Sequence, residues 1–205
     1  MSDAPNAPET AQQFFWNAVA CAAGADASIQ FSRSGTPGAP RRLESQYLYL
    51  RMLLLAQGLE LAVKGWFLHQ GVSVADLRRR AFGHDLVSLY QRAGRDGFPL
   101  GGHAELWVMT MVNAVYREDK ELQYAKPQRV SWPSSRAVRE LLHESLRAVS
   151  AALYPAVNLD KVQQASDPGR WLGLRTDSFD HYAGPSLQQL RQAGTEAMSL
   201  PAEAG

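Results

Sequence analysis

Two pairs of arginine and histidine have a spacing that could support phosphodiester chemistry. Arg136 and His143 are seven residues apart in a segment with helical periodicity, so both would project from one helix face. Arg79 and His84 lie on either side of Gly83, which breaks the local helical pattern. A histidine that titrates near neutral pH can move a proton at a ribose 2′-hydroxyl, and a guanidinium beside it stabilises charge on a phosphoryl group. Either pair could therefore act on RNA without a metal ion.

Both pairs also have a structural interpretation, in which His143 lies on the flank of a core helix and His84 belongs to a helix start. Basic residues are nevertheless concentrated around the second pair. Residues 76–95 hold five arginines against two aspartates, although the chain has a formal net charge of only +1. A guanidinium can bind two phosphate oxygens at once, so this segment predicts a surface for nucleic acid or a nucleotide. The excess of arginine over lysine also fits a high-GC genome, and this alternative stays open. The candidate contact residues are Arg78, Arg79, Arg80 and Arg92.

Metal and cofactor motifs are missing from the sequence. There is no G-x-x-x-x-G-K-[ST] loop, no G-x-G-x-x-G after a strand pattern and no G-x-S-x-G turn. The five histidines are scattered, and the lone Cys21 excludes an internal disulfide or a site built on several thiolates. We therefore expect neither a metal site nor a cofactor.

The elements that position these residues are predicted to be helices. Arg41 to Gln70 is apolar on most of its circumference, which is typical of a central helix surrounded by others. Within it, Glu60 and Lys64 are four residues apart with the acid first, which predicts an ion pair on one face. Ser134 and Ser135 can cap a last core helix that runs to about Tyr154.

Further helices are expected on either side of these, and no alternation supports a sheet. Gly24 is expected to end the first helix and to begin a long loop rich in turn formers. The additional expected elements are a helix over 10–23, the loop over 24–40, and helices over 84–93 and 103–116. The fold class is therefore predicted to be all-α, a four- to five-helix up-and-down bundle.

The bundle is expected to span residues 10–155, between two less ordered segments. Residues 1–9 are rich in Pro, Ala and Asn and are expected to be disordered. Residues 156–205 hold few large apolar side chains and are expected to form a partly ordered, poorly structured extension, with a helix over 186–198. No apolar run is long enough to cross a membrane, and the N-terminus lacks the pattern of a signal peptide, so we expect a cytoplasmic protein.

The segment Gly58 to Ala93 resembles the HEPN superfamily of small helical domains. The residues that carry the likeness are Glu60, Lys64, Gly71, Gly83, His84, Asp85, Leu86 and Leu89. Tyr116 and the segment Glu121 to Pro127 resemble a region that follows the third long helix in related domains. The resemblance extends over roughly residues 42–155.

This resemblance implies a helical bundle, usually a homodimer, in which active members are metal-independent endoribonucleases. Their signature is an arginine followed after four to six residues by a histidine, and two protomers form a composite site. Arg136-x6-His143, Arg79-x4-His84 and Arg78-x5-His84 have this spacing, although Ala137 stands where a polar residue usually follows the arginine. Many members of the superfamily lack the motif and serve as binding domains.

Two functions are therefore favoured by the sequence, and an unrelated helical protein, such as an interaction module whose C-terminal segment docks on a partner, remains a third alternative. The first is a HEPN-like homodimer that binds RNA, a nucleotide or a partner protein in a defence, toxin–antitoxin or RNA-related setting. The second is a metal-independent endoribonuclease that uses an Arg-x4-6-His motif. The apolar segment Leu106 to Tyr116 exceeds what one small bundle readily buries, which favours a two-fold interface.

Overall fold

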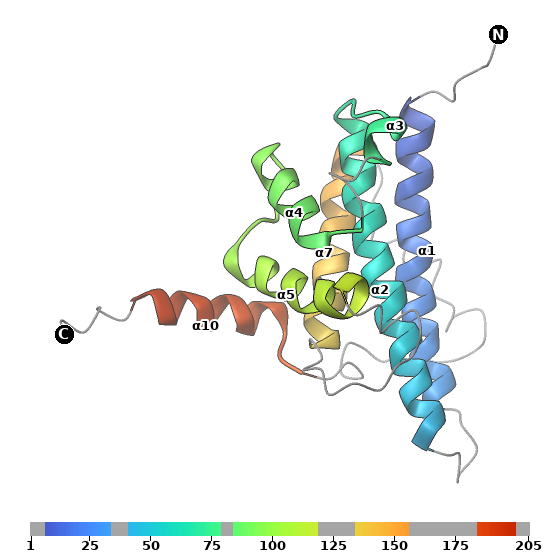
Figure 1. Cartoon of the computed structure of the whole chain (residues 1–205), viewed down its shortest axis with the longest axis vertical. Coiled ribbons are helices and arrows are strands. Elements are labelled where there is room, and N and C mark those ends of the chain that lie inside the picture. Colours follow the sequence, from blue (N-terminus) through green and yellow to red (C-terminus); the bar gives the residue numbers. More distant parts are fainter. Residues whose placement is uncertain (1–6, 34–40, 79–83, 119–133, 156–183, 200–205) are drawn as a thin grey trace.

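The computed structural model of the chain describes residues 7–33, 41–78, 84–118, 134–155 and 184–199. Every regular element in these ranges is a helix, which confirms the all-α class (Figure 1). The helices are α1 (Ala7–Arg33), α2 (Arg41–His69), α3 (Val74–Leu77), α4 (Leu86–Arg95), α5 (His103–Asn113), the π-helix η2 (Ala114–Glu118), α7 (Ser135–Leu153) and α10 (Leu187–Ser199).

The helices α1, α2 and α7 pack along their lengths and form the body of the bundle (Figure 1). Cross-contacts fix the direction of α7. Asp26 on α1 pairs with Arg139 near the start of α7, whereas Trp16 donates to Tyr154 just beyond its end. The chain of α7 is therefore antiparallel to α1.

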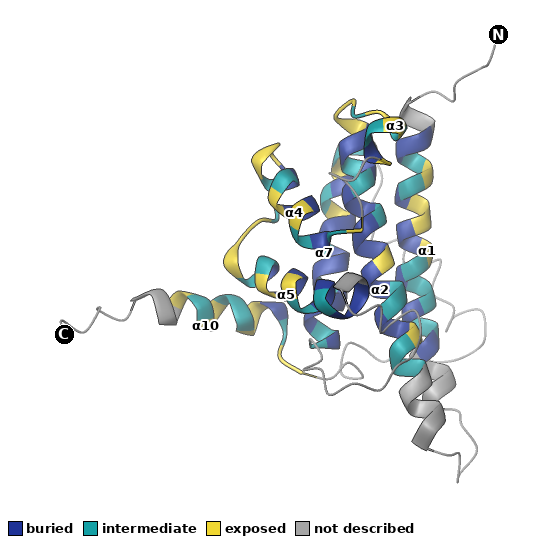
Figure 2. Ribbon diagram, in the orientation of Figure 1, coloured by how far each residue is buried: buried dark blue, intermediate teal, exposed yellow. Residues whose placement is uncertain are grey.

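The central position predicted for Arg41 to Gln70 is confirmed by α2, which packs against α1, α7 and α4. Buried residues are concentrated where α2 and α7 face each other, and exposed ones on the outer sides of α1 and α4 (Figure 2). The fully buried apolar residues of α2 are Met52, Leu55, Ala56, Leu59, Ala62, Val63 and Phe67. This core fixes the position of the charged residues in the middle of α2 relative to their neighbours.

Close approach of three helices depends on Gly58 in the middle of α2. A Cβ atom at this position would lie 2.8 Å from a methyl carbon of Leu142 on α7 and 3.2 Å from the Cβ of Cys21 on α1. The absence of a side chain therefore lets α1 and α7 close over α2 at this level. Burial also raises the pKa of the Cys21 thiol, which disfavours the reactive thiolate.

The expected boundaries of the first helix were wrong. α1 begins at Ala7, inside the segment 1–9 that was expected to be disordered, and continues past Gly24 to Arg33. Gly24 lies against Leu54, with its Cβ position 3.3 Å from a methyl carbon, so packing on α2 outweighs the roughly 1 kcal/mol that glycine costs a helix. The expected loop over 24–40 therefore does not begin at Gly24, and its residues 34–40 lie outside the described part of the chain.

Capping residues define the starts of the shorter helices. The cap predicted at Ser134 is observed, since its hydroxyl oxygen accepts from the backbone N–H of Ala137. Ser73 caps α3 in the same way and accepts from the backbone N–H of Asp76. Asp85 is the N-cap of α4, and its side chain accepts from the backbone N–H of Ser88.

The helix expected over 186–198 is confirmed by α10, which lies beneath α5 and projects sideways from the bundle (Figure 1). Residues 156–183 of the expected extension lie outside the described residues. Within the described part of the chain, no helix is long and apolar enough to span a membrane.

Candidate functional site

A buried carboxylate in the middle of α2 collects three polar partners. Glu60 is 5% exposed. Its Oε1 lies 2.6 Å from Nζ of Lys64, while its Oε2 accepts from the hydroxyl of Tyr116 and from Nδ1 of His84, each at 3.0 Å. We refer to Glu60, Lys64, His84 and Tyr116 as the Glu60 cluster. The predicted ion pair between Glu60 and Lys64 is thereby confirmed.

Three separate elements bring this cluster together. Glu60 and Lys64 occupy successive turns of α2, Tyr116 lies in η2, and His84 stands one residue before the N-cap of α4. Asn113, at the end of α5, fixes the start of α4 because its side-chain oxygen accepts from the backbone N–H of Leu86 at 3.0 Å. The position of His84 is thus set by both α2 and the α5–η2 segment.

The electrostatics of the cluster keep the Tyr116 hydroxyl protonated. Burial, and then the negative charge of Glu60, raises the pKa of Tyr116 above its usual value. Tyr116 therefore acts as a hydrogen-bond donor to Glu60 under ordinary conditions. Its ring also meets the His84 ring edge-on, with centroids 6.4 Å apart.

His84 is the accessible member of the cluster. Its side chain is 73% exposed, whereas that of Glu60 is 7% exposed. Because a carboxylate only accepts hydrogen bonds, Nδ1 of His84 is the donor to Glu60, and the neutral ring then carries its acceptor nitrogen at Nε2. An imidazole held this way can accept a proton from a ligand and return it, which is the role of a general acid–base group.

The arginine partners predicted for His84 are only partly described. Arg78 is exposed and forms the C-cap of α3. Arg79 and Arg80 lie outside the described residues, so the Arg79–His84 pairing stays a prediction.

The second candidate pair is built into the bundle. Nε of Arg136 lies 3.1 Å from Oε1 of Glu140, one turn further along α7. His143 is only 9% exposed, on the face of α7 that also buries Leu142 and Leu146. Although seven residues separate Arg136 from His143, the structure presents no accessible Arg–His surface on the described length of α7, because the guanidinium is paired and the imidazole is packed.

The sequence does contain one spacing typical of helix-borne metal ligands, Glu140-x-x-His143 on α7, so the expectation that metal motifs are missing was wrong at this position. No group of three or more His, Cys, Asp or Glu within the described ranges is arranged to hold a metal ion. Glu140 also serves another purpose, since its Oε2 accepts from the backbone N–H of Leu187 at 2.6 Å.

Accessible guanidinium groups lie at the end of α3 and in the last turn of α4. The side chain of Arg92 is 42% exposed, with Nε 3.8 Å from a carboxylate oxygen of Asp96. Its guanidinium carbon also lies 5.9 Å from the centre of the Phe67 ring, near the end of α2. Arg95 is exposed in the same last turn of α4. We use the name arginine surface for these three accessible side chains of α3 and α4, Arg78, Arg92 and Arg95.

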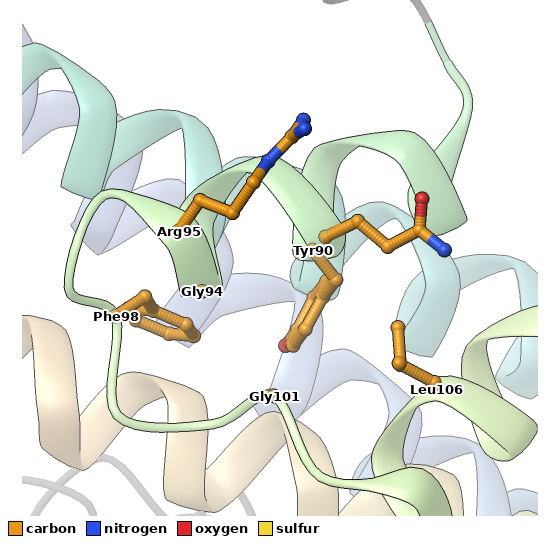
Figure 3. Close-up of a pocket in the computed structure, with 7 residues that line it drawn as sticks. Tyr90, Gly94, Arg95, Phe98, Gly101 and Leu106 are labelled. Atoms are coloured by element: carbon orange, nitrogen blue, oxygen red, sulfur yellow. The ribbon is translucent and has the colours of Figure 1, made fainter.

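A shallow hollow of about 460 Å³ lies between α4 and α5 (Figure 3). Its lining consists of Tyr90, Gln91, Gly94, Arg95, Phe98, Gly101 and Leu106. The rings of Tyr90 and Phe98 meet edge-to-face, with their centroids 5.8 Å apart. The Tyr90 hydroxyl is hydrogen-bonded to the Ser145 hydroxyl, so neither ring offers a polar group to a ligand. In Figure 3 the Arg95 guanidinium extends away from Phe98 and Leu106, so it does not line the floor of the hollow.

The fold and the Glu60 cluster together define an all-α helical-bundle protein in which a buried carboxylate orients one exposed imidazole. Comparisons with protein-family profiles, with curated proteins and with solved structures find no match to this chain. Its function must therefore be inferred from its own residues.

Proposed function

We propose that this chain is a HEPN-like module that binds RNA as a homodimer and does not cleave it. The observation that carries the proposal is the arginine surface, whose side chains stay accessible on α3 and α4. Arg139, in contrast, is withdrawn into the bundle and paired with Asp26. Guanidinium groups that solvent can reach are available to phosphate oxygens.

The packing of α7 supports binding over catalysis at the Arg136–His143 pair. His143 lies on a buried face, and the Arg136 guanidinium is bonded to Glu140. A general acid–base group must reach the proton it moves, within a hydrogen-bond length of the ligand. The buried His143 does not meet this requirement in one copy of the bundle, although the Arg136 side chain is 36% exposed.

An exposed aromatic residue of α5 supports the proposed homodimer. The sequence places an apolar surface at Leu106 to Tyr116, and within it Val108, Met109 and Val112 are buried in the bundle itself. Trp107 remains 48% exposed. In the proposed homodimer, the Trp107 ring packs against a second copy of the chain, so that α5 contributes to a two-fold interface.

RNA binding is tested by titrating a labelled single-stranded RNA with the purified chain and with the R78A/R92A/R95A variant. We expect binding that weakens steeply between about 50 and 200 mM salt. The variant should show a smaller salt dependence, with a log–log slope reduced by about 0.7 for each phosphate that it no longer neutralises. The control is R147A, which removes an exposed arginine of α7. Equal affinity and slope in all three proteins would refute the proposal.

A second function, metal-independent RNA cleavage, is favoured by one observation at the Glu60 cluster. Glu60 holds Nδ1 of His84 at 3.0 Å while most of the His84 ring is exposed. In such a reaction Nε2 of His84 would take the proton from a ribose 2′-hydroxyl, and the 2′-oxygen would form a bond to phosphorus. The bond from phosphorus to the 5′-oxygen would break, that oxygen would take a proton from solvent water, and a 2′,3′-cyclic phosphate would remain.

Cleavage is tested by incubating RNA with the chain in the presence of a chelator. If the second function holds, cuts ending in 2′,3′-cyclic phosphate appear with the wild type and with H143A, and disappear with H84A. The E60Q variant shows whether Glu60 only positions His84. If it does, loss of its carboxylate would shift the pH profile of cleavage without abolishing every cut. RNA that is bound and stays intact supports the first function.

A further inference from the structure

His84 differs from the other accessible histidines in having a carboxylate on its ring. Among the described residues, the exposed histidines are His69, His84 and His103. Of these, His84 is the one held by a carboxylate, with Nδ1 3.0 Å from Oε2 of Glu60. The ring of His69 lies near that of Trp66 instead, with their centroids 6.2 Å apart. A reaction that depends on an oriented imidazole is therefore expected at His84 before the other two.

The Glu60 carboxylate is itself fixed, so it holds the His84 ring in one orientation. Its Oε1 lies 2.6 Å from Nζ of Lys64, and its Oε2 also accepts from the Tyr116 hydroxyl. The Tyr116 ring meets the imidazole edge-on. The imidazole is thus anchored in the bundle through Nδ1, while 73% of the His84 side chain stays exposed to solvent.

This arrangement makes Nε2 of His84 a nucleophile. The proton of the neutral ring lies on Nδ1, where Glu60 accepts it, so Nε2 carries the available lone pair. An electrophile that bonds to Nε2 makes the ring positively charged, and the carboxylate beside Nδ1 stabilises that charge. No proton has to leave during this step, because Nδ1 keeps its own.

The charge of the surrounding sequence favours an anionic electrophile. Residues 76–95 hold five arginines against two aspartates. An excess of positive charge raises the local concentration of anions, among which phosphorylated compounds are electrophiles at phosphorus. Metal binding is a poorer match, since no three His, Cys, Asp or Glu side chains of the described segments are grouped to hold an ion. A phosphoryl group therefore suits both the nucleophile and its surroundings.

We propose that His84 is a phosphorylation site, at which Nε2 accepts a phosphoryl group from a small anionic phosphodonor such as phosphoramidate. The lone pair of Nε2 forms a bond to phosphorus, and the bond between phosphorus and the donor's nitrogen breaks. That nitrogen, which is protonated in the donor near neutral pH, leaves as ammonia with the electron pair. Glu60 is the positioning residue, because it holds the proton on Nδ1 and faces the charge that the ring gains. The reaction needs no RNA, so it holds or fails independently of RNA binding.

The test incubates the full-length chain with phosphoramidate near neutral pH and then digests it under mildly alkaline conditions, which preserve phosphohistidine. Mass spectrometry gives the rate of labelling at His69, His84 and His103 within one sample, and phosphorus NMR distinguishes the Nδ1 isomer from the Nε2 isomer. We expect His84 to be labelled at least about tenfold faster than the other two, and at Nε2. The comparison is made in the wild type and so does not depend on the folding of a variant. Equal rates at the three histidines, or a label on Nδ1 of His84, would overturn the proposal.

The E60Q variant tests the part played by Glu60. Loss of the negative charge should slow the labelling of His84 by about tenfold, toward the rate at the other two histidines. The matched control is D96N, which removes a carboxylate from the opposite end of α4 and should leave His84 the fastest. His69 and His103 should be labelled at the same rate in all three proteins, which separates an effect on His84 from a change of fold. A His84 rate that E60Q leaves unchanged, or that D96N lowers equally, would overturn the role of Glu60.

Discussion

Nδ1 of His84 lies 3.0 Å from Oε2 of Glu60, although 24 residues separate the two in the chain. The contact joins the start of α4 to the middle of α2 and leaves 73% of the histidine side chain exposed. The same carboxylate also neutralises Lys64 and receives the Tyr116 hydroxyl. Glu60 therefore supports the packing of three elements and, at the same time, the orientation of an accessible imidazole.

Removing the Glu60 carboxylate should destabilise the fold strongly. In E60A the Lys64 ammonium, whose side chain is 12% exposed, would lose its counter-charge, and the Tyr116 hydroxyl would lose its acceptor. We expect a loss of about 3–5 kcal/mol in the free energy of unfolding, measured by chemical denaturation. The exposed D96N variant is the control and should change stability by less than about 0.5 kcal/mol. A loss of similar size in both variants would show that Glu60 is not buried as described.

The fold should be less stable at alkaline pH, because two tyrosines that stay protonated when buried lose their protons more readily in the unfolded chain. Burial raises the pKa of Tyr90, and burial with the charge of Glu60 raises that of Tyr116. Because the pKa of each hydroxyl is raised in the folded state, each protonated tyrosine contributes to the free energy of unfolding. This contribution is fully present below the unfolded pKa of about 10 and is lost as pH rises through the folded pKa. We expect thermal melts to show a steep decline above about pH 10. The decline should be shallower in Y116F, and an unchanged decline would contradict this assignment.

Most helices could be predicted from the sequence because their signals are local. The apolar circumference of α2, the capping serine of α7 and the turn residues around α4 each act within a few residues of the element they define. The end of α1 could not be predicted, since Gly24 is held in a helix by Leu54, which is distant in sequence. Local propensity indicated a stop, and tertiary packing outweighed it.

Two glycines in helices should respond in opposite directions to alanine. At Gly58 a methyl group would meet Leu142 at 2.8 Å, so we expect G58A to lose about 1–3 kcal/mol through overpacking between α2 and α7. At Gly194, on α10, no atom lies within 4 Å of the Cβ position. G194A should therefore gain up to about 1 kcal/mol in local helix stability. Hydrogen exchange over α10 and denaturation of the whole chain measure the two effects, and the same sign for both would contradict the packing described.

Two arginines of α7 should differ in their contribution to stability. Arg139 forms a bidentate pair with Asp26 on α1, and its side chain is 8% exposed. We expect R139A to cost about 3 kcal/mol, because it leaves Asp26 without its counter-charge at a mostly buried position. Arg136 pairs with Glu140 on its own helix at the surface, so R136A should cost less than about 1 kcal/mol. Urea denaturation of both variants provides the comparison, and equal losses would argue against the burial of the Arg139–Asp26 pair.

The candidate site was less predictable than the helices. The Glu60–Lys64 pair follows from a spacing of four residues, and it is observed at 2.6 Å. His84 and Tyr116 belong to the residues that carry the HEPN resemblance, but nothing local indicates that both reach Glu60. The Arg136–His143 spacing, in contrast, is correct for one helix face, and the packing of α7 against its neighbours decides that the histidine is buried.

We have proposed that the chain holds RNA at the arginine surface without cutting it. The most direct measurement follows one labelled single-stranded RNA in chelator, recording both the fraction bound and the length of the RNA after incubation. We predict salt-sensitive binding that the R78A/R92A/R95A variant weakens, with RNA that stays at full length. Fragments ending in 2′,3′-cyclic phosphate that disappear with H84A would contradict the claim, as would the absence of binding at low salt.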